Sequence, residues 1–271
     1  MGNPPLISII TASLNSESTI ERCMDSVLSQ LTSYPLIEYL IIDGGSYDNT
    51  LEIIKKKEKE FPKIIKWLSE KDHGIYDAMN KGIMLAKGEI IGILNSDDWY
   101  ATNIFQTIVD TFQNEHAELV YGNMIRVSGF SPGTVIGIQK STIRPFKRKM
   151  TIAHPSCFVA KRVYQQYGLF NTDLRLAADY DLLLRFLEKD VKFFHLDQEI
   201  VYFTSGGLSS NYFKSLLEST QVQKKHFGST YAIYALMRKL FETFPKFALR
   251  KIMGDSLYEK WISSVKKYNV H

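Results

Sequence analysis

The sequence predicts an α/β fold: a Rossmann-like mixed sheet of mainly parallel strands flanked by helices, with a C-terminal helical extension. Three observations lead to this expectation. Apolar runs alternate with stretches of helical periodicity through the first half of the chain. Acidic or amide residues directly follow several of these runs. From Tyr212 onward the pattern is helical, with a break expected near Pro245.

The first half of the chain supplies the parallel part of the sheet. The run 90–94 is too short for a helix and too apolar for a half-exposed strand, so we expect a central strand of a parallel sheet. Ser18 to Glu21 resembles a capping box that opens a helix, and Gly88 ends the last helix before the central strand. The expected strands are 6–11, 37–42 and 64–68, and the expected helices are 18–31, 48–60 and 75–86.

The second half is more irregular. Residues 127–149 are rich in Gly, Pro and basic residues, with alternation over 134–138, which indicates a hairpin or a mobile loop. A helix is expected from Trp99 to Glu115 and another over 179–189. The remaining expected strands are 119–124, 157–160, 191–195 and 200–203. We expect residues 1–210 to form one domain and 211–271 a basic amphipathic extension.

Composition places the chain among ordinary globular proteins, with 45% hydrophobic and 23% charged residues in 271. Cys23 and Cys157 are too few for a disulfide framework and lack metal-ligand spacing, which favours a reducing cytoplasm. We see no signal peptide and no membrane span. The net charge of +4 is concentrated in the tail, because residues 225–271 hold nine Lys and Arg against three Asp and Glu.

The most informative segment follows the central strand. Continued alternation would direct Asn95 and Asp97 to one side and Asp98 to the other. Asp43 and the pair Glu70 and Asp72 follow other predicted strands. Because the carboxyl ends of parallel strands lie at one sheet edge, these carboxylates would gather there and need a cation or a donor-rich ligand.

Four segments of the chain stand out: Ile7 to Asn15, Ile42 to Ser46, Gly74 to Gly82 and Leu94 to Asp98. Together they resemble family 2 glycosyltransferases with the GT-A fold, particularly bacterial enzymes that build surface polysaccharides. The resemblance covers roughly 6–209. It implies an inverting transfer of a sugar from a nucleotide diphosphate donor, most often a UDP-sugar, to a saccharide or lipid-linked acceptor.

The resemblance also implies a nucleotide pocket. Asp43 would bind the base or the ribose, and Asp72 would make a second contact near the uracil. Thr11 and Ser13, at the end of the first predicted strand, would line the same pocket.

The family's Asp-x-Asp position is occupied by Asn95, Ser96 and Asp97. Asp97 would bind Mg²⁺ or Mn²⁺. A site with few protein ligands suits these hard cations, because they complete their coordination shell with phosphate and water. Asn95 and Ser96 would contact the donor. Asn95 replaces the usual Asp and removes one negative charge, whereas Asp98 is expected to be mainly structural.

An inverting reaction needs a base near the acceptor hydroxyl. The segment 177–185 resembles the family's Glu-Asp motif, with Ala178 in place of Glu. Asp179 matches the motif's Asp, and Asp181 is the alternate, since residues two apart on a helix face nearly opposite directions. Both could instead be favourable acids at a helix N-terminus.

Two further positions have open interpretations. His154 resembles a residue on the acceptor side of the cleft, although a structural role for a lone His before Pro is also expected. Gly206 and Gly207 resemble a segment that could close over the diphosphate, or they form a plain turn.

The tail carries an apolar helical stripe beside basic residues. It could lie on an anionic membrane surface, form a homodimer or pack on the main domain. We expect a cytoplasmic protein with no nucleic-acid partner. If the tail binds a membrane, the protein would be peripheral on the inner face of that membrane. The stripe comprises Ile233, Leu236, Met237, Leu240 and Phe241.

Two competing functions remain at this stage. The replacements at Asn95 and Ala178 allow a nucleotide-sugar-binding module without turnover. A nucleotidyltransferase would also use such a sheet and a metal, but the loop 13–16 lacks the Lys or Arg that its phosphate loop would need.

Overall fold

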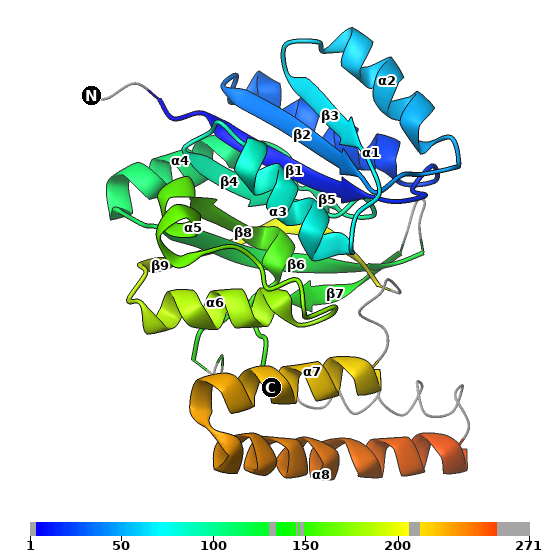
Figure 1. Ribbon diagram of the computed structural model, residues 1–271, viewed down its shortest axis with the longest axis vertical. Helices are drawn as coiled ribbons and strands as arrows, with labels where there is room; N and C mark the ends of the chain where they lie inside the picture. The colour runs from blue at the N-terminus through cyan, green and yellow to red at the C-terminus, as the bar shows by residue number, and fades with distance from the viewer. Residues whose placement is uncertain (1–3, 130–133, 145, 147–148, 206–211, 254–271) are drawn as a thin grey trace. The chain divides into compact units, whose positions relative to one another are not determined.

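The computed structural model describes residues 4–129, 134–144, 146, 149–205 and 212–253 (Figure 1). The chain divides into two compact units, Met1–Ser219 and Thr220–His271, and each is considered by itself. The domain boundary expected between 210 and 211 lies outside the described residues.

One mixed sheet forms the centre of the first unit, with strand order β3-β2-β1-β4-β8-β6-β9-β5 and β7 paired to β6 (Figure 1). The predicted α/β class of the fold is confirmed, and so are the mainly parallel strands in the first half of the chain. The strands are β1 Ile7–Ser13, β2 Ile37–Asp43, β3 Ile65–Ser69, β4 Ile90–Ile93, β5 Trp99–Tyr100, β6 Leu119–Ser128, β7 Thr134–Gln139, β8 Cys157–Ala160 and β9 Phe193–Ser205.

The central strand β4 marks a change of direction in the sheet. It pairs parallel with β1 but antiparallel with β8. The strand is central and the sheet is mixed, as expected, but the parallel part of the sheet ends at β4. An apolar run reports burial on both faces of a strand, and burial does not depend on the direction of its neighbours.

Helices cover both faces of this sheet. One face packs against α1 and α4, whose buried residues share a core cluster with β1 and β2. The other face carries α3, α5 and α6 (Figure 1). The helices are α1 Ile20–Leu28, η1 Ser29–Thr32, α2 Thr50–Glu60, α3 Ile75–Leu85, α4 Ile104–Glu115, η2 His154–Ser156, α5 Lys161–Tyr167, α6 Ala178–Glu188, α7 Tyr212–Phe227 and α8 Ser229–Met253.

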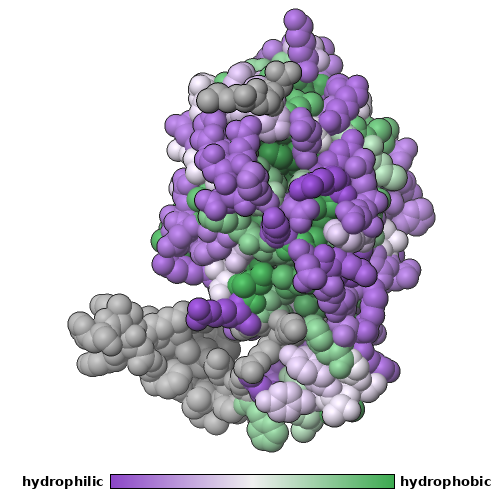
Figure 2. Space-filling model, turned by 90° about the vertical axis from the view of Figure 1, so that its left-hand side faces the viewer, coloured by the Kyte–Doolittle hydropathy of each residue, from purple (hydrophilic) through white to green (hydrophobic). Residues whose placement is uncertain are grey.

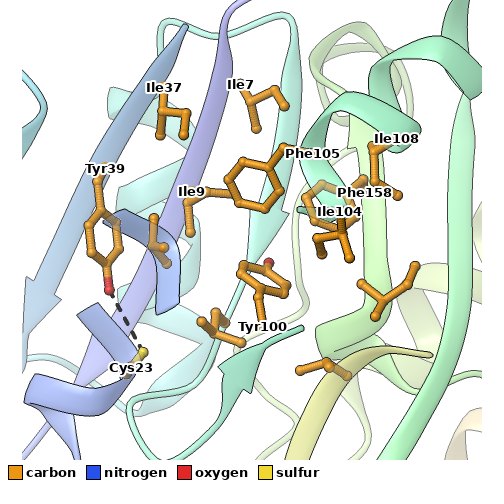
Figure 3. Packing of buried hydrophobic residues seen from close by; sticks show 14 of the residues in the cluster. Ile7, Ile9, Cys23, Ile37, Tyr39, Tyr100, Ile104, Phe105, Ile108 and Phe158 are labelled. Atoms are coloured by element: carbon orange, nitrogen blue, oxygen red, sulfur yellow. Dashed lines mark hydrogen bonds between the residues drawn. The ribbon is translucent and has the colours of Figure 1, made fainter. Parts of the chain in front are cut away.

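The core on the α1 and α4 side combines isoleucines with interlocked aromatic rings (Figure 3). Phe105 packs edge-on against both Tyr100 and Phe158, with centroids 5.4 and 5.7 Å away. Cys23 of α1 and the Tyr39 hydroxyl of β2 lie 3.7 Å apart. These contacts fix the strands whose carboxyl ends carry the candidate site.

Three local expectations are corrected by the structure. The first backbone N–H of α1 donates to the Ser16 carbonyl, and no side-chain cap forms, so the expected capping box is absent. Residues 193–195 and the piece 200–203 belong to one long strand, β9, which pairs with β6 through register shifts. Helix α8 continues through Pro245, and the chain turns instead at Gly228, whose φ is +85°.

The surface of the first unit is largely polar. On the face seen in Figure 2, hydrophilic side chains cover most of it and hydrophobic groups show between them. In the described part of the chain, no helix combines the length and apolar character that a membrane span requires.

Candidate functional site

A cleft of about 630 Å³ opens at the carboxyl ends of the parallel strands. This volume is typical of small-molecule sites, and the location is where open α/β sheets bind ligands. Its polar and titratable lining comes from widely separated segments: Ser13, Asn15, Ser16, Asp72, Asn95, Ser96, Asp97, His154, Arg175 and Asp179. Met79, Met124, Met150, Ile152 and Phe203 are among its apolar lining residues.

Hydrogen bonds join the loops at this edge. The hydroxyls of Ser16 and Ser96 lie 2.8 Å apart and connect the loops after β1 and β4. The backbone N–H of Asn15 donates to Ser46 Oγ at 2.7 Å, and Asn15 Oδ1 accepts from the N–H of Tyr47. The rim of the cleft is thus built by side chains that bond neighbouring loops, which holds it in one arrangement.

The turn after β4 directs its polar side chains to different sides, as expected. A hydrogen-bonded turn from Asn95 to Asp98 sets these directions in place of the predicted strand alternation. Asn95 and Asp97 line the cleft, whereas Asp98 is fully buried. Asp98 accepts from the backbone N–H of Thr204 at 2.9 Å and from the Asn95 amide at 3.0 Å. Asp98 anchors β9 to the turn, in agreement with its expected structural role.

The side chains present fit a metal that arrives with a phosphorylated ligand. In the described residues, no three His, Cys, Asp or Glu side chains form a metal-binding cluster. Mg²⁺ and Mn²⁺ can be held by one or two carboxylates plus substrate phosphate and water, which needs no such cluster. Burial raises the pKa of Asp97 and so favours its neutral form. A nearby cation would act in the opposite direction and favour the charged carboxylate. The Asn95 amide nitrogen donates to Asp98, which leaves its oxygen as the atom able to ligate.

Serine and threonine at the end of β1 occupy different environments. Ser13 lines the cleft, and its buried Oγ has no hydrogen-bond partner in the described structure. Thr11 is fully buried and faces α1, with its hydroxyl 3.0 Å from the Tyr39 hydroxyl. Thr11 does not line the cleft here, although it shares a face of β1 with Ser13, because it lies two residues deeper in the strand against Cys23 and Tyr39. Its contact with a nucleotide stays a prediction.

Asp43 is fully buried at the end of β2 and does not line the cleft. Its carboxylate accepts from the backbone N–H groups of Gly45 and Ser46 at 3.1 and 2.9 Å, and from Ser69 Oγ at 2.7 Å. In this structure Asp43 shapes the turn after β2. Its direct contact with a base or ribose stays a prediction.

Asp72 lies in the cleft as expected. Its Oδ1 accepts from the Gly74 backbone N–H at 2.8 Å. Its other oxygen packs against Gly44, where an added Cβ would come within 2.5 Å. Gly44 therefore allows the carboxylate to lie against the backbone of the β2 loop.

Asp179 faces the cleft from the first turn of α6. Its Oδ1 accepts from the Tyr76 hydroxyl at 3.4 Å and from the N–H of Tyr180 at 2.8 Å. Burial raises the pKa of Asp179 to about 6, against which these two hydrogen bonds act. A carboxylate with a pKa near neutrality can accept a proton at physiological pH more readily than an exposed aspartate.

Asp181 lies on a different side of α6. It is fully buried and accepts from Arg185 Nε at 3.1 Å. Arg185 in turn donates to the carbonyls of Tyr167 and Leu169. Asp181 therefore anchors α6 to the segment after α5, and the geometry favours Asp179 as the residue available to a substrate.

His154 lines the cleft, and its ring lies edge-on to Phe170 with centroids 5.2 Å apart. Burial lowers its pKa to about 4, so the ring is neutral at physiological pH. Gly206 and Gly207 lie outside the described residues.

No sequence pattern pointed to Arg175. Its guanidinium lines the cleft and donates to the carbonyl of His73, so the loop before α6 reaches the loop before α3. It packs against Gly74, whose φ is +122° and where a Cβ would lie 2.6 Å from Nη1. Arg175 and Gly74 are about a hundred positions apart in the sequence, and no local sequence pattern predicts their contact.

Comparison with known proteins agrees with this geometry. The model of the family described as "Glycosyl transferase family 2" matches residues 8–168. A PGL/p-HBAD biosynthesis glycosyltransferase of Mycobacterium bovis is 30% identical over 184 residues, which cover 67% of this chain and 69% of the relative. The chondroitin synthase of Pasteurella multocida is 31% identical over 72% of this chain, which spans only 20% of that protein.

Solved structures share the fold at low identity. S. aureus TarS 1–349 in complex with UDP-GlcNAc has a TM-score of 0.65 and 17% identity, covering 89% of this chain and 73% of that one. This chain covers 43% of the longer TarS structure. The mannosyltransferase PcManGT of Pyrobaculum calidifontis, in complex with GDP-Man and Mn²⁺, has a TM-score of 0.63 and 14% identity, covering 96% and 83%. The chain has the GT-A fold and belongs to glycosyl transferase family 2.

Proposed function

We propose that this protein is a metal-dependent inverting glycosyltransferase that moves a sugar from a nucleotide diphosphate donor, with UDP as the favoured nucleotide, to a saccharide or lipid-linked acceptor. The observation that carries the proposal is the meeting of Asp97 and Asp179 on one cleft. They come from different elements and offer two separate functions, a carboxylate for a cation and a carboxylate for a proton.

The donor half of the cleft would be formed by the loops after β1, β3 and β4. Ser13 offers a hydroxyl whose partner would come from the ligand. Asp72 would contact the nucleotide. Asn95, Ser96 and Asp97 would face the diphosphate, with Asp97 holding Mg²⁺ or Mn²⁺. Such a cation would neutralise charge on the leaving diphosphate.

Asp179 would act as the base. Single-displacement transfer with inversion requires the acceptor oxygen to attack the sugar's anomeric carbon on the face opposite the leaving diphosphate. As the new C–O bond forms and the bond to the diphosphate breaks, the acceptor proton passes to the Asp179 carboxylate. Tyr76 would orient that carboxylate through its hydroxyl, and His154, neutral in its buried position, would form part of the acceptor side.

The polymer or glycolipid context of the relatives supports an acceptor in surface polysaccharide or glycolipid synthesis. In the second unit, α8 exposes Ile233, Tyr234, Met237 and Phe241. Together with the basic charge of the tail, this face supports binding to an anionic membrane surface or to a second copy. Binding to a membrane would place the protein on its cytoplasmic face, beside a lipid-linked acceptor.

A nucleotide panel tests the donor assignment. We expect UDP and UDP-sugars to raise the melting temperature more than GDP, ADP or their sugars, and the increase to grow with Mn²⁺ or Mg²⁺. Donor turnover should then be followed as release of nucleoside diphosphate. Stabilisation without turnover, with any acceptor offered, would favour the binding module suggested by Asn95 and Ala178. No stabilisation by any nucleotide would refute the proposal.

A further inference from the structure

A carboxylate from α7 holds the loop that leads into α6. Glu218 Oε2 accepts from three consecutive backbone N–H groups, those of Arg175 at 3.0 Å, Leu176 at 2.7 Å and Ala177 at 3.1 Å. Helix α6 has no cap from the side chain of its own N-cap residue, Ala177. Glu218 therefore supplies the acceptor that the start of α6 lacks, from a position 41 residues later.

The loop held in this way controls two groups of the cleft. Arg175 extends from it to the carbonyl of His73, which ties the loop before α6 to the loop before α3. Asp179 follows in the first turn of α6. Tyr76, the hydroxyl donor to Asp179, lies in the first turn of α3. Glu218 thus holds the loop that connects these two groups, and this loop sets the distance between Tyr76 and Asp179.

The charge of Glu218 also reaches Asp179. Burial is the larger cause of the raised pKa of Asp179, and the negative charge of Glu218 adds to it. The other groups that act on this carboxylate are the Tyr76 hydroxyl and the N–H of Tyr180, which lower its pKa, while the thiol of Cys157 on β8 stays protonated because burial raises its own pKa. Removing the charge of Glu218 would therefore lower the pKa of Asp179.

We propose that Glu218 is a positioning residue for the transfer reaction, which holds the Arg175 to Ala177 loop so that Asp179 meets the acceptor hydroxyl. The inference rests on the proposed role of Asp179 as the base. It assigns Glu218 no contact with substrate.

The test compares Glu218→Gln with wild type in the full chain. The glutamine side chain keeps an acceptor oxygen but loses the charge. We expect kcat to fall by about tenfold or more, because small displacements of a reacting group are costly, while KM for the donor changes little. The acidic limb of the pH profile should move to lower pH. A purely structural role would lower the melting temperature but leave kcat, measured below the melting transition, at the wild-type value.

Controls separate this inference from the proposed function. Glu115→Gln removes one exposed carboxylate from α4 and should leave both kcat and the pH profile unchanged. Glu218→Asp keeps the charge on a shorter side chain, so it should retain the position of the limb with reduced kcat, and it serves if Glu218→Gln does not fold. A folded Glu218→Gln enzyme with wild-type kcat overturns the inference, whether or not the limb moves. Unchanged turnover in Asp179→Asn would instead overturn the role of Asp179.

Discussion

The hydroxyl of Tyr76 donates to Oδ1 of Asp179 at 3.4 Å, across 103 positions of sequence. Tyr76 stacks on Phe170 with centroids 5.3 Å apart and planes 24° from parallel, so its ring has a fixed orientation. The carboxylate is therefore held by a donor from α3 while its own helix supplies the N–H of Tyr180. One oxygen of Asp179 takes both hydrogen bonds, which leaves the other for an acceptor proton.

We expect Asp179→Asn to lower kcat by about 10² to 10⁴-fold, the usual contribution of a positioned base. Nucleotide binding should remain, because Asp179 is placed on the acceptor side. Single-turnover assays and thermal shifts with UDP measure the two effects separately.

Asp181→Asn is the matched control. It replaces the buried carboxylate that faces Arg185, so it should cost about 1 to 3 kcal/mol of stability, yet keep the wild-type turnover number below the melting transition. Loss of turnover in Asp181→Asn with normal turnover in Asp179→Asn would reverse the assignment.

The pH dependence should follow the pKa of about 6 for Asp179. The base works only when ionised, so kcat/KM should be level above this pH and fall about tenfold for each unit below it. Tyr76→Phe removes a hydrogen bond that lowers this pKa. Its acidic limb should therefore move to higher pH, opposite to the shift expected for Glu218→Gln. A limb in Tyr76→Phe at or below the wild-type position would argue against this picture.

Much of the site could be predicted because it follows from strand order. Once β1, β3 and β4 were recognised as parallel, their carboxyl ends had to meet, which brought Ser13, Asp72 and Asp97 together. The opposed directions of Asp179 and Asp181 followed from helical periodicity alone. Such features depend on neighbours within a few residues or on a repeated pattern.

The side-chain partners that the sequence did not indicate are set by contacts between distant residues. Thr11 is buried beneath the cleft, where its hydroxyl contacts Tyr39 and Cys23. Asp43 turns to the backbone of its own loop and to Ser69. Arg175 and Glu218 act through residues 102 and 41 to 43 positions away, and neither belongs to a recognisable spacing. A sequence pattern reports which side of an element is buried, but not which partner a polar group meets.

Asp97→Asn should abolish the part of donor binding that depends on Mg²⁺ or Mn²⁺. The variant loses the charge that a hard cation needs, so the added metal should no longer raise the melting temperature of the UDP complex. We expect the donor affinity measured with Mn²⁺ by calorimetry to fall at least tenfold.

Asp72→Asn provides the comparison for that experiment, since Asp72 also lines the cleft but is expected to contact the nucleotide. It should weaken UDP binding by a similar factor with and without metal. Equal metal dependence in Asp97→Asn and wild type would remove Asp97 from the cation site.

Ser13→Ala tests whether the donor forms a hydrogen bond with the Ser13 hydroxyl at the end of β1. The buried Ser13 Oγ has no hydrogen-bond partner in the described structure, so its removal should leave the free energy of unfolding unchanged or slightly higher. A donor that supplies the missing partner would lose one hydrogen bond, worth about 1 kcal/mol, and bind roughly fivefold more weakly. Chemical denaturation and titration with UDP measure the two quantities. Ser156→Ala is the control, because its buried hydroxyl lies within hydrogen-bond distance of the carbonyls of Gly122 and Ala153 and does not line the cleft. This variant should therefore reduce stability and leave UDP affinity unchanged. Wild-type UDP affinity in Ser13→Ala would mean that the nucleotide does not reach the end of β1.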